Sequence, residues 1–153
     1  MKVVDILEPN AVITPLKGTS RDEILQELST CLANVHQELN AEHIYDVLLS
    51  REKLNSTGIG DGIAVPHGRV NGLDKVKGAL GLSPEGIPFG DSEEERTHIF
   101  FVLLAPHKPV GAHLKALARV CRLLKGTDLA KRLITLETSS AIYQTLSEKD
   151  AQL

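Results

Sequence analysis

A glycine-rich stretch, STGIGDGIAVPHGR at residues 56–69, lies between predicted helices and predicted strands. Its glycines, Gly58, Gly60 and Gly62, alternate along the chain, and His67 stands between a proline and a glycine. Glycine permits backbone conformations that are closed to other residues, while proline fixes its own φ and favours an extended residue before it. The stretch therefore predicts a preorganised loop that gives one imidazole a defined direction.

His67 is the leading candidate for chemistry. Imidazole changes charge near neutral pH, and its ring nitrogen is a competent nucleophile. A loop histidine that only forms a hydrogen bond is the competing interpretation, and it would be preferred for an arbitrary histidine. The dense glycine and proline context reverses that preference, so we predict a reactive histidine on an exposed loop.

The composition predicts one domain, residues 1–153, with an aliphatic core. Hydrophobic residues make up 42% of the chain, aromatic residues make up 3%, and tryptophan is absent. The net charge of −3 argues against a basic surface that tracks nucleic-acid phosphates. The N-terminus lacks a signal peptide's apolar core, and the longest apolar run, Ile99–Ala105, is too short to span a bilayer. We expect a cytoplasmic protein with no nucleic-acid partner and no membrane insertion.

The sequence offers no motif for a metal or a cofactor. Cys31 and Cys121 are isolated and are interpreted as small core residues. The alternating glycines lack the context of a nucleotide site, GxGxxG or GK[ST]. Histidines without metal-ligand spacing are interpreted as surface or strand-end residues; they are His36, His43, His98 and His107.

Apolar spacing predicts an α/β fold in which helices sandwich one sheet. The first predicted helix is 21–36, with a capping signal at Thr19 and Ser20, and a second is capped by Asn40. The others are 110–124, a short helix after Gly126, and one capped by Thr138 or Ser139 that ends near Leu146. The predicted strands are Val12–Ile13, 76–82 and 98–105, the last covered on both faces. A turn is expected at Pro84–Gly86 and a solvated loop at Asp91–Glu95.

Arg51 is the second candidate residue. Helical spacing from Ile44 places it on the apolar stripe of its helix, where a charge is costly unless it is paired. One interpretation is that it satisfies carbonyl groups at the helix C-terminus. The other is that its guanidinium points at the glycine-rich loop and binds the oxygens of a phosphoryl group. The sequence leaves both open.

His113 is the third candidate, in the first turn of a predicted helix. A half-buried histidine with a structural hydrogen bond is the competing interpretation. Because a helix N-terminus disfavours imidazolium, a neutral His113 could donate a hydrogen bond to an anion held on another histidine. Ser56 and Thr57 are possible hydroxyl donors, although such residues in glycine loops usually only form turns.

The loop 58–68 resembles the phosphorylation-site signature of type-2 enzyme IIA domains of the bacterial phosphotransferase system, the mannitol/fructose class. The longer match over residues 51–68, REKLNSTGIGDGIAVPHG, is most similar to the nitrogen-regulatory branch, enzyme IIA-Ntr. The resemblance covers nearly the whole chain and is loose in the last helices. It implies a single-domain fold with a mixed sheet between helices.

The resemblance also implies roles for individual residues. His67 matches the histidine that accepts a phosphoryl group on Nε2, as tele-phosphohistidine, from an HPr/NPr-like phosphocarrier protein. Arg51 matches the arginine that steadies this group, and His113 matches the histidine that hydrogen-bonds it. Ser56, Thr57 and Gly68 are expected to support the phosphate. Arg69 stands where the family often has lysine, and no catalytic role is assigned to it.

Three functions are compatible with this reading. The first is a nitrogen-type regulator whose phosphorylation state controls protein targets such as kinases or potassium transport systems. The second is a sugar-specific enzyme IIA that passes phosphate to a IIB domain of a fructose or mannitol transporter. The third is a IIA-like binding module without phosphotransfer, which the joint presence of Arg51, His67 and His113 disfavours.

Overall fold

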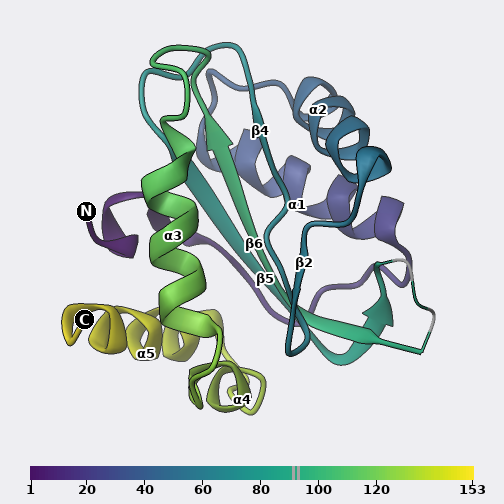
Figure 1. Ribbon diagram of the computed structural model, residues 1–153, viewed down its shortest axis with the longest axis vertical. Helices are drawn as coiled ribbons and strands as arrows, with labels where there is room; N and C mark the ends of the chain where they lie inside the picture. Colours follow the sequence, from purple (N-terminus) through teal and green to yellow (C-terminus); the bar gives the residue numbers. More distant parts are fainter. Residues whose placement is uncertain (91, 93) are drawn as a thin grey trace.

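The computed structural model describes residues 1–90, 92 and 94–153. Within them, one mixed sheet runs in the order β1-β5-β6-β3-β2, and β4 also pairs with β6 (Figure 1). The strands are β1 (Leu7–Ile13), β2 (Gly58–Gly60), β3 (Ile63–Ala64), β4 (His67–Arg69), β5 (Lys77–Pro88) and β6 (Arg96–Ala105). Strand β6 is antiparallel to β5 and parallel to both β3 and β4. The strand order, which the sequence patterns left open, is thereby known.

Helices cover both faces of this sheet, as predicted (Figure 1). They are α1 (Arg21–Val35), α2 (Ala41–Leu54), α3 (His113–Leu124), α4 (Leu129–Leu133) and α5 (Ser139–Ala151); a 3₁₀ turn, η1, spans Val3–Asp5. Capping side chains explain where three of them begin. Ser20, Asn40 and Thr138 each accept a hydrogen bond from the backbone N–H three residues later, which confirms the predicted caps.

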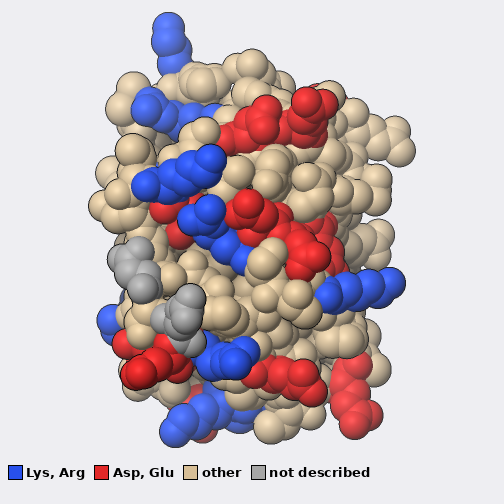
Figure 2. Space-filling model, turned by 90° about the vertical axis from the view of Figure 1, so that its right-hand side faces the viewer, with Lys and Arg blue, Asp and Glu red and all other residues tan. Residues whose placement is uncertain are grey.

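The core centres on β6, as its apolar sequence predicted. Residues 99–105 of this strand are each at most 1% exposed, so both faces of the strand are covered. The surrounding core is mainly aliphatic, with Phe89 and Phe100 in edge-to-face contact at a ring separation of 5.0 Å. The outer face formed by α1 and α2 carries acidic and basic side chains side by side (Figure 2). No described helix is long and apolar enough to cross a membrane.

Several element boundaries differ from the predictions. Strand β1 begins at Leu7 rather than near Val12, because pairing with β5 extends it past exposed polar residues. Strand β5 continues through the predicted turn at residues 84–86, where Gly86 takes a φ of +76° and the register with β6 shifts. Helix α5 extends beyond Leu146 to Ala151. Two residues of the predicted acidic loop, 91 and 93, lie outside the described residues.

A buried ion pair ties the chain termini to α3. Asp150 is fully buried and accepts 2.8 Å and 2.7 Å hydrogen bonds from Nε of Arg119 and the backbone N–H of Val3. Arg119 also donates from Nη2 to the backbone oxygen of Asp150 at 2.8 Å. One carboxylate thus joins the N-terminal segment, α3 and α5, which explains why α5 continues past Leu146, its last buried apolar residue.

Candidate functional site

His67 lies on β4 rather than on a free loop. The β4 register pairs it with Leu103 of β6, and it is half-buried, which corrects the prediction of an exposed loop. Its Nδ1 lies 2.8 Å from the backbone oxygen of Val65. A carbonyl oxygen can only accept, so Nδ1 carries the proton of the neutral ring. Nε2 is then left with a lone pair, as a nucleophile requires.

His113 stacks on His67. The two ring centroids are 5.5 Å apart and the ring planes differ by 20°. Helix α3 begins at His113, later than the predicted 110, because Gly111 has a φ of +80° that a right-handed helix excludes. Burial, followed by repulsion from His67 when it is protonated and from Arg69, lowers the pKa of His113 below its ordinary value. The shift favours the neutral form of His113, which keeps one N–H to donate.

Arg51 forms hydrogen bonds at the end of its helix and also lines the same groove as the two histidines. Its Nη1 donates to the backbone oxygen of Asn55 at 3.0 Å and to the side-chain oxygen of Asn55 at 2.9 Å. These bonds match the first interpretation of the Arg51 sequence position, in which the side chain satisfies carbonyl groups at the helix C-terminus. Among the described residues, Nε and Nη2 of Arg51 have no hydrogen-bond partner, so part of the guanidinium stays available.

One groove brings these three residues together. Its lining residues are Val47, Ser50, Arg51, Leu54, His67, Gly68, Arg69, His107 and His113. They include two arginines and, within the described part of the chain, no carboxylate. A half-enclosed groove with this charge favours an anion, and arginine matches the geometry of phosphoryl oxygens. The arrangement can hold a phosphoryl group next to a nucleophilic imidazole nitrogen.

Sequence reasoning missed the two other ionisable residues that line the groove. Arg69 was given no role, although its position two residues after His67 on a strand puts both side chains on one face. That spacing was a usable signal once β4 was known to be a strand. His107 was interpreted as a surface residue; it is exposed, but it lines the groove. Only the path of the chain after β6 brings it there.

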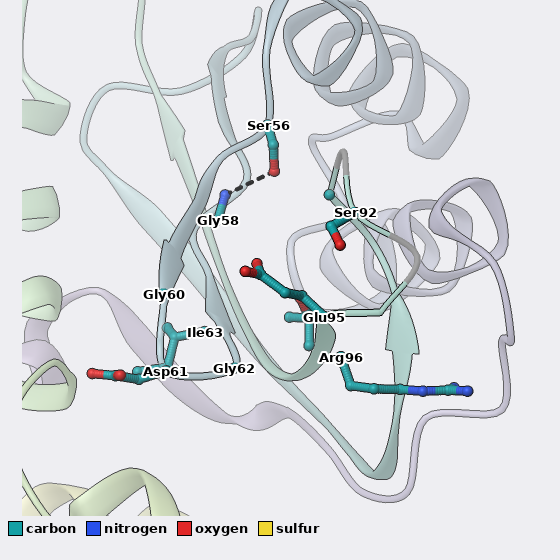
Figure 3. A pocket seen from close by; sticks show the side chains of 11 residues that line it. Ser56, Gly58, Gly60, Asp61, Gly62, Ile63, Ser92, Glu95 and Arg96 are labelled. Carbon is teal, nitrogen blue, oxygen red and sulfur yellow. Dashed lines mark hydrogen bonds between the residues drawn. The ribbon is translucent and has the colours of Figure 1, made fainter.

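Ser56 and Thr57 lie outside the groove. The Ser56 hydroxyl accepts the Gly58 backbone N–H at 3.1 Å, as a turn-forming residue does. Ser56 lines a separate hollow with the alternating glycines, and the Glu95 carboxylate points into that hollow (Figure 3). Thr57 is buried against Glu52. Direct phosphate contact, predicted for both, therefore has no support in their positions.

Gly68 allows α2 to approach β4 closely. A Cβ built on Gly68 would lie 2.4 Å from Cγ1 of Val47, well inside van der Waals contact. Val47 is on α2, one turn before Arg51. The absence of a side chain at Gly68 therefore sets the separation between the helix that carries Arg51 and the strand that carries His67.

Replacing Gly68 with alanine should cost about 1–3 kcal/mol of unfolding free energy, because β-branched Val47 cannot move aside freely. Urea denaturation measures this loss. Val47→Ala removes the clashing methyl group, so the effects of Gly68→Ala and Val47→Ala should be less than additive. Gly58→Ala is the matched control, since its Cβ would meet the movable Ser56 hydroxyl at 3.3 Å and the Ile63 backbone oxygen at an ordinary van der Waals distance of 3.9 Å. Additive losses for the Gly68 and Val47 variants would contradict this account.

Known proteins resemble this chain over nearly its whole length. A family model described as "Phosphoenolpyruvate-dependent sugar phosphotransferase system, EIIA 2" matches residues 5–149. A nitrogen regulatory protein of Bradyrhizobium diazoefficiens is 37% identical over 147 residues, covering 96% of this chain and 95% of that protein. A nitrogen regulatory protein of Pseudomonas aeruginosa is 31% identical over 144 residues, covering 94% of each. The crystal structure of nitrogen regulatory protein IIA-Ntr from Neisseria meningitidis matches with a TM-score of 0.83 and 26% identity, covering 94% of this chain and 98% of that chain.

Proposed function

The chain belongs to the EIIA 2 family of the phosphoenolpyruvate-dependent sugar phosphotransferase system, and on that premise we propose that His67 is its phosphoryl acceptor. The donor is a phosphohistidine on an HPr/NPr-like phosphocarrier protein. The hydrogen bond from Nδ1 of His67 to the Val65 carbonyl carries this proposal, because it leaves the Nε2 lone pair for phosphorus. The product is tele-phosphohistidine.

The transfer needs no proton to move at His67. The Nε2 lone pair forms the new N–P bond while the donor's N–P bond breaks, and the electron pair of that bond returns to the donor imidazole. Such a transition state is loose, so catalysis depends on in-line positioning and on stabilising the charge of the oxygens. Arg51 and Arg69 provide positive charge, and neutral His113 donates a hydrogen bond.

The surroundings of the groove suit a protein donor. Leu54 lines the groove and is 79% exposed, while Val110 and Leu114, which flank His113 in sequence, are 81% and 60% exposed. Large apolar side chains exposed beside a reactive group are typical of a docking surface. A carrier that buries these side chains brings its phosphohistidine to His67.

We propose that the biological role is regulatory. Two relatives that span nearly the same length are named nitrogen regulatory proteins, and this supports the nitrogen-type role over the sugar-type role. A phosphoryl group on His67 adds negative charge to a cationic groove, so protein partners that bind this face can distinguish the two forms. Kinases and potassium transport systems are target classes to test.

A sugar-specific enzyme IIA remains the alternative, since the family description names sugar phosphotransferase systems. In that role His67 would pass its phosphoryl group to a IIB domain of a fructose or mannitol transporter. The pure binding module is disfavoured, because a protein that carries no phosphate has no need of a nucleophilic nitrogen beside two arginines.

Labelling from radioactive phosphoenolpyruvate, with enzyme I and an HPr-type carrier, tests the acceptor function. We expect one phosphoryl group per chain. The labelled protein is then mixed with a fructose- or mannitol-type IIB domain, and we expect the label to remain because the role is regulatory. Rapid loss to IIB would replace the regulatory proposal with the sugar-specific one. No labelling by any HPr- or NPr-type carrier would contradict both.

A further inference from the structure

A buried carboxylate stands behind the site without touching the groove. Glu52 follows Arg51 on α2 but is only 5% exposed. Its carboxylate accepts the backbone N–H of Thr57 at 2.9 Å and also accepts the Thr57 hydroxyl. No cation pairs with Glu52 among the described residues. Because burying an unpaired carboxylate is costly, a simple structural role does not account well for a charged residue at this position.

Thr57 connects this carboxylate to the backbone before His67. The backbone oxygen of Thr57 accepts the N–H of Val65 at 3.1 Å. The backbone oxygen of Val65 in turn lies 2.8 Å from Nδ1 of His67. A continuous series of hydrogen bonds therefore runs from Glu52 through Thr57 and Val65 to the imidazole.

The other side of the same backbone is also held. Pro66 separates Val65 from His67, and its backbone oxygen accepts the N–H of Leu103 at 2.9 Å. The sheet thus restrains His67 from one side, and Thr57 restrains Val65 from the other. The direction of the Val65 carbonyl then depends on where Thr57 sits, which depends on Glu52.

We propose that Glu52 is a positioning residue: through Thr57 it aims the Val65 carbonyl, and so holds His67 as the Nδ1–H tautomer with Nε2 directed into the groove. This rests on the proposed function of His67 as acceptor. A charged acceptor is suited to this task because hydrogen bonds to an ionised group are about twice as strong as neutral ones. The tautomer of a histidine is set by the hydrogen bond that its other nitrogen makes.

Nitrogen NMR of the unphosphorylated protein is the direct test, because it reports which ring nitrogen of His67 carries the proton. Wild type and Glu52→Gln, whose amide oxygen still accepts from Thr57, should show the Nδ1–H tautomer. Glu52→Ala should give a mixture of tautomers. Its phosphoryl uptake from the carrier should fall about tenfold to a hundredfold, the scale set by an ångström of misplacement. A folded Glu52→Ala protein whose His67 stays entirely Nδ1–H would overturn the proposal.

Two further comparisons separate positioning from general stability. Asp150→Asn perturbs another buried carboxylate, far along the chain from His67, and should leave the His67 tautomer unchanged whatever stability it loses. If Glu52→Ala does not fold, the variants Thr57→Val and Thr57→Ser test the proposal instead. Valine lacks the hydroxyl and should shift the tautomer of His67, whereas serine keeps the hydroxyl and should give the wild-type tautomer. Identical tautomers in these two variants would overturn the proposal. Because NMR needs no carrier, a wild type that takes up no phosphate would contradict the acceptor function while leaving the tautomer result interpretable.

Discussion

Replacing His67 with alanine should abolish phosphoryl uptake in the folded protein. The substitution removes the only group proposed to form a covalent bond with phosphorus, and deleting a nucleophile costs on the order of 10⁶-fold in rate. In a labelling experiment with enzyme I and an HPr-type carrier, a decrease of this size means that the variant takes up no detectable label. Circular dichroism should show that the variant keeps its helices, because His67 is half-buried at the end of the sheet rather than in the core.

His43→Ala is the matched control for this experiment. His43 is also partly buried, lies on α2 and accepts a backbone N–H from Asn71 at 3.3 Å, but it does not line the groove. Its variant should take up label at the wild-type rate. Persistent label in His67→Ala would move the acceptor to another residue, with His113 and His107 the first to examine because they share the groove.

Replacing Asp150 with alanine should lower the free energy of unfolding by about 3–5 kcal/mol. The substitution leaves the guanidinium of Arg119, which is 18% exposed, without its fully buried carboxylate partner, and breaking one side of a buried ion pair carries a cost of this size. The backbone N–H of Val3 also loses its acceptor. The free energy of unfolding of natural domains is about 5–15 kcal/mol, so the expected loss is a large share of the total stability. Urea denaturation at constant pH measures this loss.

The exposed pair of Arg21 and Asp22 gives the comparison for Asp150. These side chains are 3.0 Å apart but 36% and 53% exposed, so Asp22→Ala should cost no more than about 1 kcal/mol. Removing both Arg119 and Asp150 should cost less than the sum of the single losses, because the double variant leaves no unpaired buried charge. Equal losses for Asp150→Ala and Asp22→Ala would contradict the assigned role of the buried pair.

Local patterns predicted much of the fold. The caps at Ser20, Asn40 and Thr138, and the apolar run of β6, depend on interactions between near neighbours in sequence, and the structure confirms all of them. Predictions of strands failed where pairing with a distant strand extended an element. Strand β5 passes through a sequence that is typical of a turn because pairing with β6 resumes at Ile87.

For the candidate site too, local features were predictable from the sequence and long-range ones were less so. The imidazole, the guanidinium and the second histidine were each recognisable from their own surroundings in sequence, together with a family resemblance. Their proximity was expected, chiefly from that resemblance, but the groove that they share and the contributions of Arg69 and His107 depend on the tertiary structure. The roles of Ser56 and Thr57 changed, because a hydroxyl near the reactive histidine in sequence can point away from it in space.

By itself, the sequence of residues 56–69 singled out His67 as the candidate nucleophile and predicted a preorganised backbone around it, since glycine and proline act on φ and ψ of their own and adjacent residues. Only the tertiary structure decided the protonated nitrogen of His67, its stacking on His113 and the closeness of Arg51. These depend on a carbonyl direction, on the start of α3 and on a helix packed against Gly68. The stacking and the helix packing are contacts between elements distant in sequence, while the contact of His67 with the nearby Val65 carbonyl depends on the backbone path that the pairing of β4 with β6 sets.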